Sequence, residues 1–505
     1  MFAKILSATL HGIDALIVNV EVDLSRGLPG WQIVGLPETM IRESRDRVAA
    51  AIRNSGYKLA SRKTTINLSP ADIKKHGTAF DLPIAVGLLS ATGIYAPEKT
   101  RGWLIAGELS LTGELLPIPG AISFAISARK SGLVGIILPA QNSREASLVP
   151  GIDVVGAGNL SQVVNFLGSE ERPACENLSR RRPSLEHEVD FTDIKGQYKA
   201  RRALEIAAAG SHHILFFGPP GTGKTMLAER LPTILPPLDY EEALEVTQIH
   251  SIFGFVDRSD PLMTARPFRA PHHSASYAGL IGGGNGLPRP GEISLSHNGV
   301  LFMDELPEFK RDVLESLRQP LEAGRVQITR AGGSLAYPAS FMFVAAMNPC
   351  KCGYLGHPTK ACICSIGQIQ SYRRRTSGPL LDRIDMQVEV PPLMPSELAS
   401  GEPGEASSAI LSRVLAARKR QQKRYNKIKC NNRLTVRMLK EYCPLSSEAI
   451  SFLSKLTEKM NLSARAHDRI IRIARTIADL EGTPDIALTH LSEAAQYRGL
   501  DREIY

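Results

Sequence analysis

Short apolar runs separated by Gly and Pro fill the first third of the chain, and they predict buried strands. The clearest runs lie at residues 15–18, 104–106 and 135–138. Between them, residues 41–54 space their apolar positions as an amphipathic helix does. Strands and helices mixed in this way predict an α/β domain over residues 1–167.

Apolar residues then recur at helical spacing and predict a helix with one apolar face, closed by Gly210. The face is formed by Ala200, Ala203, Leu204, Ala207 and Ala208. Beyond it, apolar runs at 214–217, 300–303 and 341–347 predict buried strands that alternate with helices. This order is typical of a parallel sheet covered on both faces.

Two polar, Pro-containing stretches divide the chain, and a helix-rich segment ends it. Helical patterns over 409–425, 447–461 and 464–480 predict a separate helical domain. We therefore expect four parts: an N-terminal domain at 1–167, a linker at 168–190, a core at 191–392 and a C-terminal helical domain at 393–505, the last opening with a flexible stretch at 393–408.

The composition is that of an ordinary globular protein. Of the 505 residues, 43% are hydrophobic and 22% charged, and no apolar stretch approaches the ~18 residues that span a bilayer. The first residues lack the pattern of a secretory signal, so we expect a cytoplasmic protein without a membrane partner. A net charge of +9 favours polyanions such as nucleic acid, although charge alone discriminates weakly.

Residues 218–225 form a complete phosphate-binding loop. In order they are Gly218, Pro219, Pro220, Gly221, Thr222, Gly223, Lys224 and Thr225. A predicted strand precedes the loop and a helical pattern follows it, which is the context that the motif requires. The glycines allow the backbone to wrap a phosphate. Lys224 would reach the β- and γ-phosphates of ATP, and the Thr225 hydroxyl would hold Mg²⁺.

Polar residues end the next two predicted strands. The run at 300–303 is followed by Asp304, which would hold Mg²⁺, and by Glu305, which would orient and deprotonate the attacking water. The run at 341–347 is followed by Asn348, which would position that water. Alternatively, Asn348 only begins an Asn-Pro turn.

Two arginines are candidates to stabilise the charge that develops on the γ-phosphate, because a guanidinium fork matches phosphate oxygens. Arg383 lies in the segment 378–385, and Arg465 lies at the start of a helix in the last domain. We expect Arg383 to reach the site of a neighbouring subunit. We expect Arg465 to act as a sensor within its own subunit.

Four of the seven cysteines form two close pairs, Cys350 with Cys352 and Cys362 with Cys364. Four thiolates can close a tetrahedral shell around a structural Zn²⁺ ion. The segment between the pairs has turn residues and no helix or strand pattern, so it needs a clamp. Reduced thiols without a metal are the alternative. His357 ranks below every cysteine as a ligand.

Several segments together resemble the ComM/YifB family of magnesium-chelatase-like AAA+ ATPases. They lie at 193–197, 218–225, 269–273, 290–294, 299–307, 378–385, 463–466, 469–472 and 474–482. The resemblance implies an AAA+ P-loop core of α/β fold with a C-terminal helical lid. It also implies a homo-oligomeric ring, expected to be a hexamer, with sites at subunit boundaries. The ComM branch promotes branch migration of DNA in natural transformation, so the resemblance implies an ATP-driven DNA helicase with single-stranded or branched DNA as its partner.

The first domain resembles the proteolytic domain of Lon-type proteases, which has a ribosomal-S5-like α+β fold. The matching segments are 74–83 and 106–120. By this resemblance the Ser nucleophile falls on Ala79 and the Lys base falls near Ile122. Neither side chain can act as nucleophile or base, so we expect a Lon-like fold without peptidase activity.

Three regions are candidates to bind DNA. One is the Gly-rich segment 277–286, with its flanking Arg and His residues. Another is a basic helix that carries Arg413, Arg418, Lys419, Arg420, Lys423, Arg424 and Lys427. The third is the cysteine loop with Lys351, Lys360, Tyr372, Arg373, Arg374 and Arg375. For the basic helix, an ordinary solvated face is an equal alternative.

Three other functions stay open at this point. The first is a motor subunit of a metal chelatase that acts on a tetrapyrrole. The second is an ATP-dependent protein-remodelling factor or protease. The third is a nucleotide-binding scaffold without turnover. The missing Ser–Lys pair argues against a protease. The presence of Glu305 and Arg383 argues against a scaffold.

Overall fold

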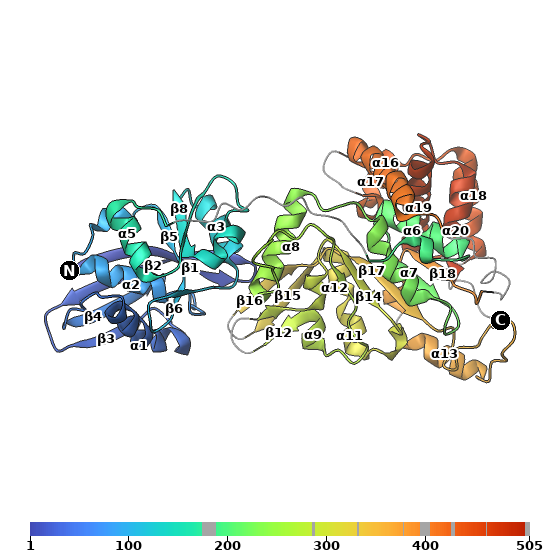
Figure 1. Cartoon of the computed structure of the whole chain (residues 1–505). Coiled ribbons are helices and arrows are strands. Elements are labelled where there is room, and N and C mark those ends of the chain that lie inside the picture. The colour runs from blue at the N-terminus through green and yellow to red at the C-terminus, as the bar shows by residue number, and fades with distance from the viewer. Residues whose placement is uncertain are drawn as a thin grey trace.

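The structure, a computed structural model, describes residues 1–173, 188–284, 288–330, 333–376, 378–393, 404–425, 430–460 and 462–499. Most of the predicted linker 168–190 and of the stretch 393–408 lies outside these residues, as do Cys175 and Lys427. Figure 1 shows an elongated molecule with the N-terminal domain at one end, a parallel-sheet core in the middle and the helical domain beside the core.

The N-terminal domain is built on a seven-stranded mixed sheet in the order β3-β4-β2-β1-β5-β8-β9. The strands are β1 (Phe2–His11), β2 (Asp14–Ser25), β3 (Gly30–Val34), β4 (Lys63–Ser69), β5 (Trp103–Ile105), β8 (Gly135–Pro139) and β9 (Asp153–Ala157), with a small hairpin of β6 (Glu108–Leu109) and β7 (Leu115–Leu116). The helices are α1 (Thr39–Asn54), α2 (Asp81–Ala91), α3 (Ala121–Lys130), α4 (Ala140–Ala146) and α5 (Leu160–Ser169). The helix α2 is buried along its whole length, which is why its sequence is apolar all round.

The core is a five-stranded parallel sheet in the order β11-β14-β17-β10-β18. Its strands are β10 (Ile214–Phe217), β11 (Phe268–Arg269), β14 (Val300–Met303), β17 (Met342–Met347) and β18 (Met386–Glu389). Alternate residues of β10 enter different hydrophobic clusters, Ile214 and Phe216 on one face and Leu215 on the other. Both faces are buried, and this explains the unbroken apolar runs in the sequence.

Helices and hairpins surround this sheet. The helices are α6 (Tyr198–Gly210), α7 (Lys224–Arg230), α8 (Tyr240–Phe253), α9 (Tyr277–Ile281), α10 (Glu292–Leu295), α11 (Arg311–Ser316), α12 (Arg318–Ala323), α13 (Ile366–Arg375) and α14 (Gly378–Leu381). The hairpins are β12 (Gly282–Gly283) with β13 (Arg289–Pro290), and β15 (Arg325–Arg330) with β16 (Gly333–Pro338).

The N-terminal domain docks on α8 of the core through buried polar contacts. Gln248 Nε2 donates to the Ile13 carbonyl at 2.6 Å, and Ser251 Oγ accepts from the backbone N–H of Gly120 at 3.0 Å. The Ser251 hydroxyl also donates to the buried carboxylate of Glu145. The two domains are therefore joined by directional contacts in addition to the chain connection.

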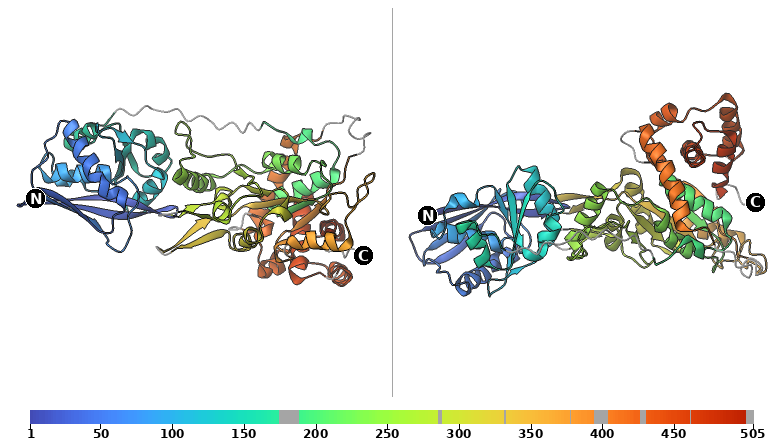
Figure 2. Two further views of the ribbon diagram at one scale, coloured as in Figure 1. Left: turned by 90° about the horizontal axis from the view of Figure 1, so that it is seen from below. Right: turned by 45° about the horizontal axis from the view of Figure 1, so that its top comes forward.

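The helical domain consists of α16 (Ser407–Tyr425), α17 (Val436–Tyr442), α18 (Ser447–Lys459), α19 (Ala464–Glu481) and α20 (Leu488–Gln496). It packs on α6 of the core, and α16 lies along that helix (Figure 2). Gln421 Nε2 and Arg418 Nη2 donate to carbonyl oxygens near the end of α6, those of Ala209 and Ala208, at 3.1 and 2.9 Å.

The predicted role of Gly210 as the residue that closes α6 is wrong in detail. Gly210 is the last helical residue, and the left-handed cap is Ser211 at φ 59°. Glycine is needed at 210 for close approach, because an added Cβ would lie 2.1 Å from His212 Nε2 and 2.7 Å from Thr476 Oγ1. The small residue lets α19 of the helical domain pack against α6.

Across the described residues, no helix is both long enough and apolar enough to cross a membrane.

Candidate nucleotide-binding site

The phosphate-binding loop joins β10 to α7 at the carboxyl edge of the sheet. Gly221 and Gly223 have φ angles of +77° and +85°, which residues with side chains rarely adopt. At Gly218 an added Cβ would lie 2.2 Å from the carbonyl oxygen of Val390. The three glycines are thus required by backbone shape and by the close approach of the segment that follows β18.

Lys224 occupies the centre of this loop. Its Nζ donates to the carbonyl oxygens of Gly218 and Pro219 at 2.8 and 2.7 Å, and to Asn348 Oδ1 at 3.3 Å. Burial lowers the pKa of Lys224, while the carboxylates of Asp304 and Glu305 raise it. A buried ammonium that is held largely by neutral oxygens is suited to receive an anionic ligand.

Thr225 and Asp304 form the second half of the site. The Thr225 hydroxyl donates to Asp304 Oδ2 at 2.7 Å, although 79 positions separate the two residues. Asp304 Oδ1 accepts from the backbone N–H of Glu305 at 2.8 Å. Hydroxyl and carboxylate oxygens are the ligands that Mg²⁺ prefers, so this pair fits the ion that the sequence predicts.

Glu305 extends beyond the end of β14 with its side chain 55% exposed. Its backbone is left-handed, with φ 51°, so the chain turns sharply at this residue. His273 Nδ1 lies 3.5 Å from Glu305 Oε2, and its ring stacks on His272 with centroids 4.0 Å apart. The sequence had singled out His273 as a flank of the Gly-rich segment and as part of the segment 269–273, but not as a neighbour of Glu305, because no spacing rule connects the two residues.

Arg383 and Arg465 lie on the opposite edge of the sheet. Arg383 comes just before β18, whose first residue pairs with Ile214 at the start of β10. The strand β10 has four residues and leads from this edge to the phosphate loop. At about 3.3 Å per residue, the two ends of the strand lie about 13 Å apart. Arg383 Nη2 lies 2.5 Å and Arg465 Nη2 3.6 Å from the same Glu322 oxygen.

The expected role of Arg465 as a sensor within its own subunit stays a prediction. A sensor within its own subunit would contact its own phosphate loop, yet Arg465 shares Glu322 with Arg383 at the far edge. Neither arginine completes the site of its own chain in this structure.

The segment before β18 is tied to the helical domain by a buried ion pair. Asp385 is 2% exposed, and its Oδ1 lies 2.9 Å from Arg469 Nε. Although burial raises the pKa of Asp385, the adjacent His212 ring, with Nδ1 3.7 Å from Asp385 Oδ2, and the charge of Arg469 outweigh it and hold the pKa well below its ordinary value. Asp385 Oδ2 also accepts from the backbone N–H of His213 at 2.9 Å.

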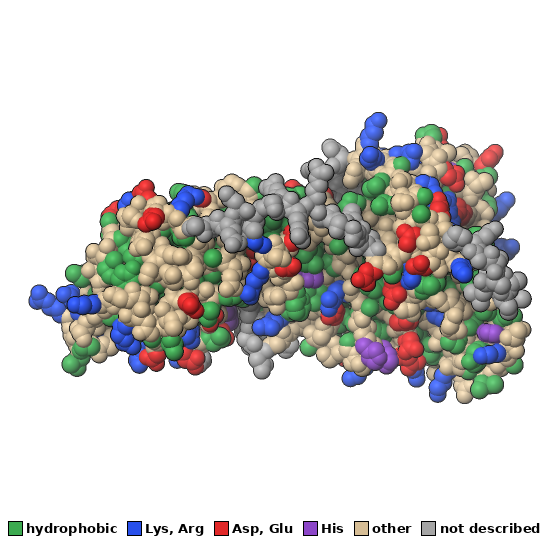
Figure 3. All heavy atoms as spheres, in the orientation of Figure 1, with side chains coloured by type: hydrophobic (Ala, Val, Ile, Leu, Met, Phe, Trp, Pro, Cys, Tyr) green, Lys and Arg blue, Asp and Glu red, His purple; other side chains and the backbone are tan. Residues whose placement is uncertain are grey.

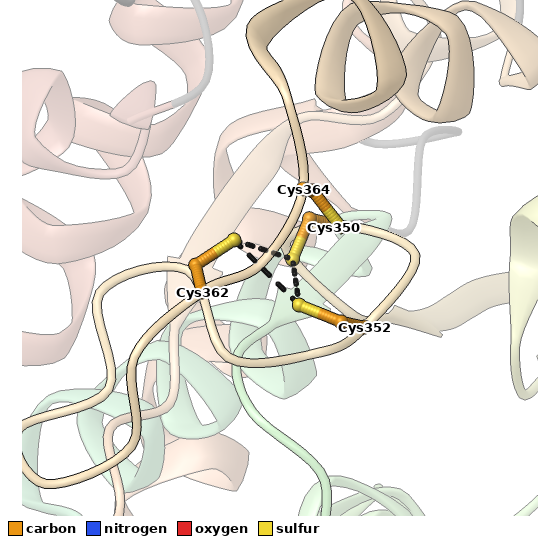
Figure 4. A group of neighbouring side chains, drawn as sticks. All are labelled: Cys350, Cys352, Cys362 and Cys364. Atoms are coloured by element: carbon orange, nitrogen blue, oxygen red, sulfur yellow. Dashed lines mark hydrogen bonds between the residues drawn. The ribbon is translucent and has the colours of Figure 1, made fainter.

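The four cysteines meet directly after Asn348 (Figure 4). Sγ–Sγ distances are 3.4 Å from Cys350 to Cys352, 3.7 Å from Cys350 to Cys362 and 3.6 Å from Cys352 to Cys362. All four sulfur atoms, including that of Cys364, lie within 4.8 Å of one another. Zn–S bonds of about 2.3 Å in a tetrahedron require S–S distances of about 3.8 Å, so the cluster fits Zn²⁺.

The lower-ranked candidate ligand, His357, does not join this cluster. His357 Nδ1 accepts from the backbone N–H groups of Thr359 and Lys360 at 3.2 and 3.1 Å, so it closes a local turn. Backbone hydrogen bonds from Tyr354 and Ile363 lower the pKa of Cys352 to about 6, which favours the thiolate that a metal needs.

Several basic residues proposed for DNA hold the fold together instead. Arg413 pairs with Glu205 and Glu405, Arg424 pairs with Asp479, and Arg269 pairs with Glu292. Tyr372 is buried, and Arg373 Nε donates to the Pro349 carbonyl at 3.3 Å. The Gly-rich segment is partly core, because Leu280 and Ile281 are buried. Lys and Arg side chains are interspersed with Asp and Glu on the face in Figure 3, without a continuous basic patch there.

In the N-terminal domain, Ala79 and Ile122 belong to one buried hydrophobic cluster. The two positions that resemble the Lon nucleophile and base therefore lie in the same apolar cluster. The neighbouring Ser123 hydroxyl donates to the Ile13 carbonyl at 2.6 Å within the same domain, and that carbonyl also accepts from Gln248 of the core.

The sheet order, the phosphate loop and the Thr225–Asp304 pair define a P-loop ATPase fold of the AAA+ class. Family models agree: residues 190–398 match "Magnesium chelatase, subunit ChlI", residues 20–142 match "Subunit ChlI of Mg-chelatase", and residues 404–498 match the C-terminal part of that subunit.

Relatives of nearly full length narrow this class. The chain is 45% identical to YifB of Escherichia coli over 496 residues, 97% of this chain and 96% of YifB. It is 44% identical to the competence protein ComM of Haemophilus influenzae over 506 residues, 99% and 98% of the two chains. A Lon protease of Mycolicibacterium smegmatis is 25% identical over 175 residues, 33% of this chain and 22% of the protease. The chain belongs to the ComM/YifB family of magnesium-chelatase-like AAA+ ATPases.

Proposed function

We propose that this protein is an ATP-driven ring motor that acts on DNA and moves branched junctions during recombination in natural transformation. The observation that carries the proposal is the division of its ATPase residues. Lys224, Thr225 and Asp304 converge on one edge of the sheet, whereas Arg383 and Arg465 gather at the other. A neighbouring copy, placed head to tail, would bring the arginines to the phosphate loop, and repetition of that contact closes a ring, which we expect to be a hexamer.

In such a site each residue has a distinct task. Backbone N–H groups of the loop and the Lys224 ammonium bind the phosphates of ATP. Thr225 and Asp304 would hold Mg²⁺, which neutralises phosphate charge when bound. Glu305 accepts a proton from the attacking water while the oxygen of that water forms a bond to the γ-phosphorus. At the same time the bond between the γ-phosphorus and the β–γ bridging oxygen breaks. Asn348 orients the water, and the neighbour's arginines stabilise the charge that develops.

DNA as the substrate is supported by other observations. The net charge of +9 favours a polyanion, and the Haemophilus relative is named a competence protein. Exposed lysines and arginines that the fold does not use as structural partners remain available, among them Lys419 and Lys423 on α16 and Arg374 on α13. These are our preferred contacts for the phosphate backbone.

The test is ATPase activity with a panel of DNA structures. We expect single-stranded or four-way-junction DNA to stimulate hydrolysis, and the purified protein to move a labelled junction only with ATP. Lys224→Ala should abolish both activities, whereas Arg101→Ala, a change at an exposed arginine of the N-terminal domain, should preserve them. Hydrolysis that no DNA structure alters would contradict the proposal.

The family models favour one second candidate, a motor subunit of a metal chelatase, because they carry the name of a chelatase subunit across three segments. That function predicts ATPase stimulation by a porphyrin instead of DNA. Both ligands can be compared in the same assay, and the one that stimulates decides between the two functions.

A further inference from the structure

The cysteine loop, residues 350–364, follows β17 and Asn348 and leads to the helix α13. The loop has turns but neither helix nor strand. Its far end is fixed by a capping box, in which Ser365 Oγ accepts from the backbone N–H of Gln368 at 3.3 Å and Gln368 Oε1 accepts from the N–H of Ser365 at 3.0 Å. Between these two fixed points the chain is held by local turns and by the sulfur cluster.

The cysteine loop lies against the phosphate-binding loop. An added Cβ at Gly353 would lie 2.8 Å from Cδ and 3.3 Å from Cγ of Pro220. Gly353 has a φ of +84° and its N–H donates to the Cys350 carbonyl at 3.0 Å, so it belongs to the turn that brings Cys350 and Cys352 together. The turn that carries two of the metal-binding cysteines therefore packs, at Gly353, directly against Pro220 of the phosphate loop.

The helix α13, which follows the cysteine loop, packs against the segment of Asn348 and Pro349, which precedes the loop. Tyr372 is buried, and the next residue, Arg373, donates from Nε to the Pro349 carbonyl at 3.3 Å, directly beside Asn348. Asn348 in turn accepts from Lys224 Nζ. The sulfur cluster is thus linked by direct contacts to the phosphate loop at Pro220 and to the segment that carries Asn348.

We propose that the cysteine loop binds Zn²⁺ and that the bound ion holds Pro220 and Asn348 in the positions that ATP binding requires. This inference rests on the proposed nucleotide site and gives the metal a role there, distinct from presenting basic residues to DNA. Loss of the ion would release Gly353 from its turn and remove the support under the phosphate loop.

One pair of variants tests the mechanical contact without removing a ligand. Gly353→Ala keeps all four cysteines but pushes a methyl group into Pro220. Gly356→Ala is the matched control, because Gly356 also has a left-handed φ, +79°, but an added Cβ meets nothing within 4 Å. We expect Gly353→Ala to retain zinc and to bind a fluorescent ATP analogue roughly tenfold more weakly, the usual scale when a supporting partner is disturbed. Gly356→Ala should resemble the wild type.

The metal is tested separately from ATP binding. Zinc released by a thiol-blocking mercurial should amount to one ion per chain in the wild type and be lost in a Cys352→Ser variant, but not in Cys443→Ala, a buried cysteine outside the loop. Co²⁺ should give the thiolate charge-transfer absorption of a tetrahedral site. Mercurial release of zinc should weaken ATP binding in both the wild type and Cys443→Ala.

The outcomes distinguish this inference from the proposed function. Zinc-free protein that binds ATP like the zinc-loaded protein, or equal ATP affinity of Gly353→Ala and Gly356→Ala, would overturn the inference and leave the ATPase proposal intact. Absence of zinc from freshly purified protein and of the Co²⁺ absorption would also overturn it. A wild type that holds zinc but binds no ATP would instead refute the nucleotide site.

Discussion

A mixing experiment tests whether Arg383 acts on the ATP of a neighbouring subunit. Arg383→Ala removes the arginine but leaves the phosphate loop of the same chain intact, about 13 Å away across the sheet. Lys224→Ala does the reverse. Each variant alone forms rings in which every subunit boundary lacks one essential group, so we expect both to be nearly inactive.

Rings assembled from equal amounts of both variants should regain activity. At a random boundary, half of the phosphate loops are intact and half of the neighbouring arginines are intact. About one boundary in four then has both groups, so the mixture should show about a quarter of wild-type ATPase activity if boundaries act independently. If Arg383 served its own chain, no subunit of the mixture would have a complete site and activity would stay at the background.

The assay is phosphate release at a fixed total protein concentration, after the two variants have been unfolded and refolded together or exchanged at high salt. A mixture of Lys224→Ala with Arg101→Ala is the matched control. Because Arg101→Ala should keep full activity, this mixture reports only the loss of activity that comes from diluting intact phosphate loops. The same experiment with Arg465→Ala tests whether Arg465 acts within its own chain or on the neighbouring site, since Arg465 and Arg383 share Glu322. Recovery that is absent at every mixing ratio, in rings shown to contain both variants, would refute the shared site.

Further predictions concern hydrolysis and stability. Glu305→Gln should bind ATP normally and slow hydrolysis by about 10²–10⁴-fold, measured in single turnover; an unchanged rate would remove Glu305 from the mechanism. Asp385→Asn leaves Arg469 without its buried partner and should lower the free energy of unfolding by about 3–5 kcal/mol at pH 7. The folded-state pKa of Asp385 lies below its ordinary 3.8. The difference in free energy of unfolding between the wild type and Asp385→Asn should therefore become smaller as the pH falls below 3.8 in denaturant titrations. Gly210→Ala should destabilise the chain by about 1–3 kcal/mol through its contacts with α19, whereas Gly168→Ala, also helical but facing open space, should not; equal thermal midpoints for the two variants would show that α6 and α19 do not pack as described.

Much of the fold could be predicted from the sequence because burial leaves a local trace. The helix expected over 41–54 is α1, and the apolar runs at 214–217 and 300–303 are β10 and β14. Both faces of the core sheet are covered, so the three central strands β10, β14 and β17 are apolar at every position, and that pattern needs no knowledge of neighbours. The helix α6 was predicted by the same reasoning, but the reason for Gly210 was not, because His212 and Thr476 approach it through the tertiary fold.

The sequence by itself determined the phosphate loop, Asp304, Glu305, Asn348 and the four clustered cysteines. Each follows directly from a strand end or a short spacing, and parallel strands bring their carboxyl ends to one edge whatever their order. Only the tertiary structure decided that Arg465 joins Arg383 on Glu322, that His273 lies beside Glu305 and that Gly353 supports Pro220. These contacts depend on strand order, on helix docking and on the path of loops between residues far apart in the chain. A one-dimensional spacing records none of these determinants.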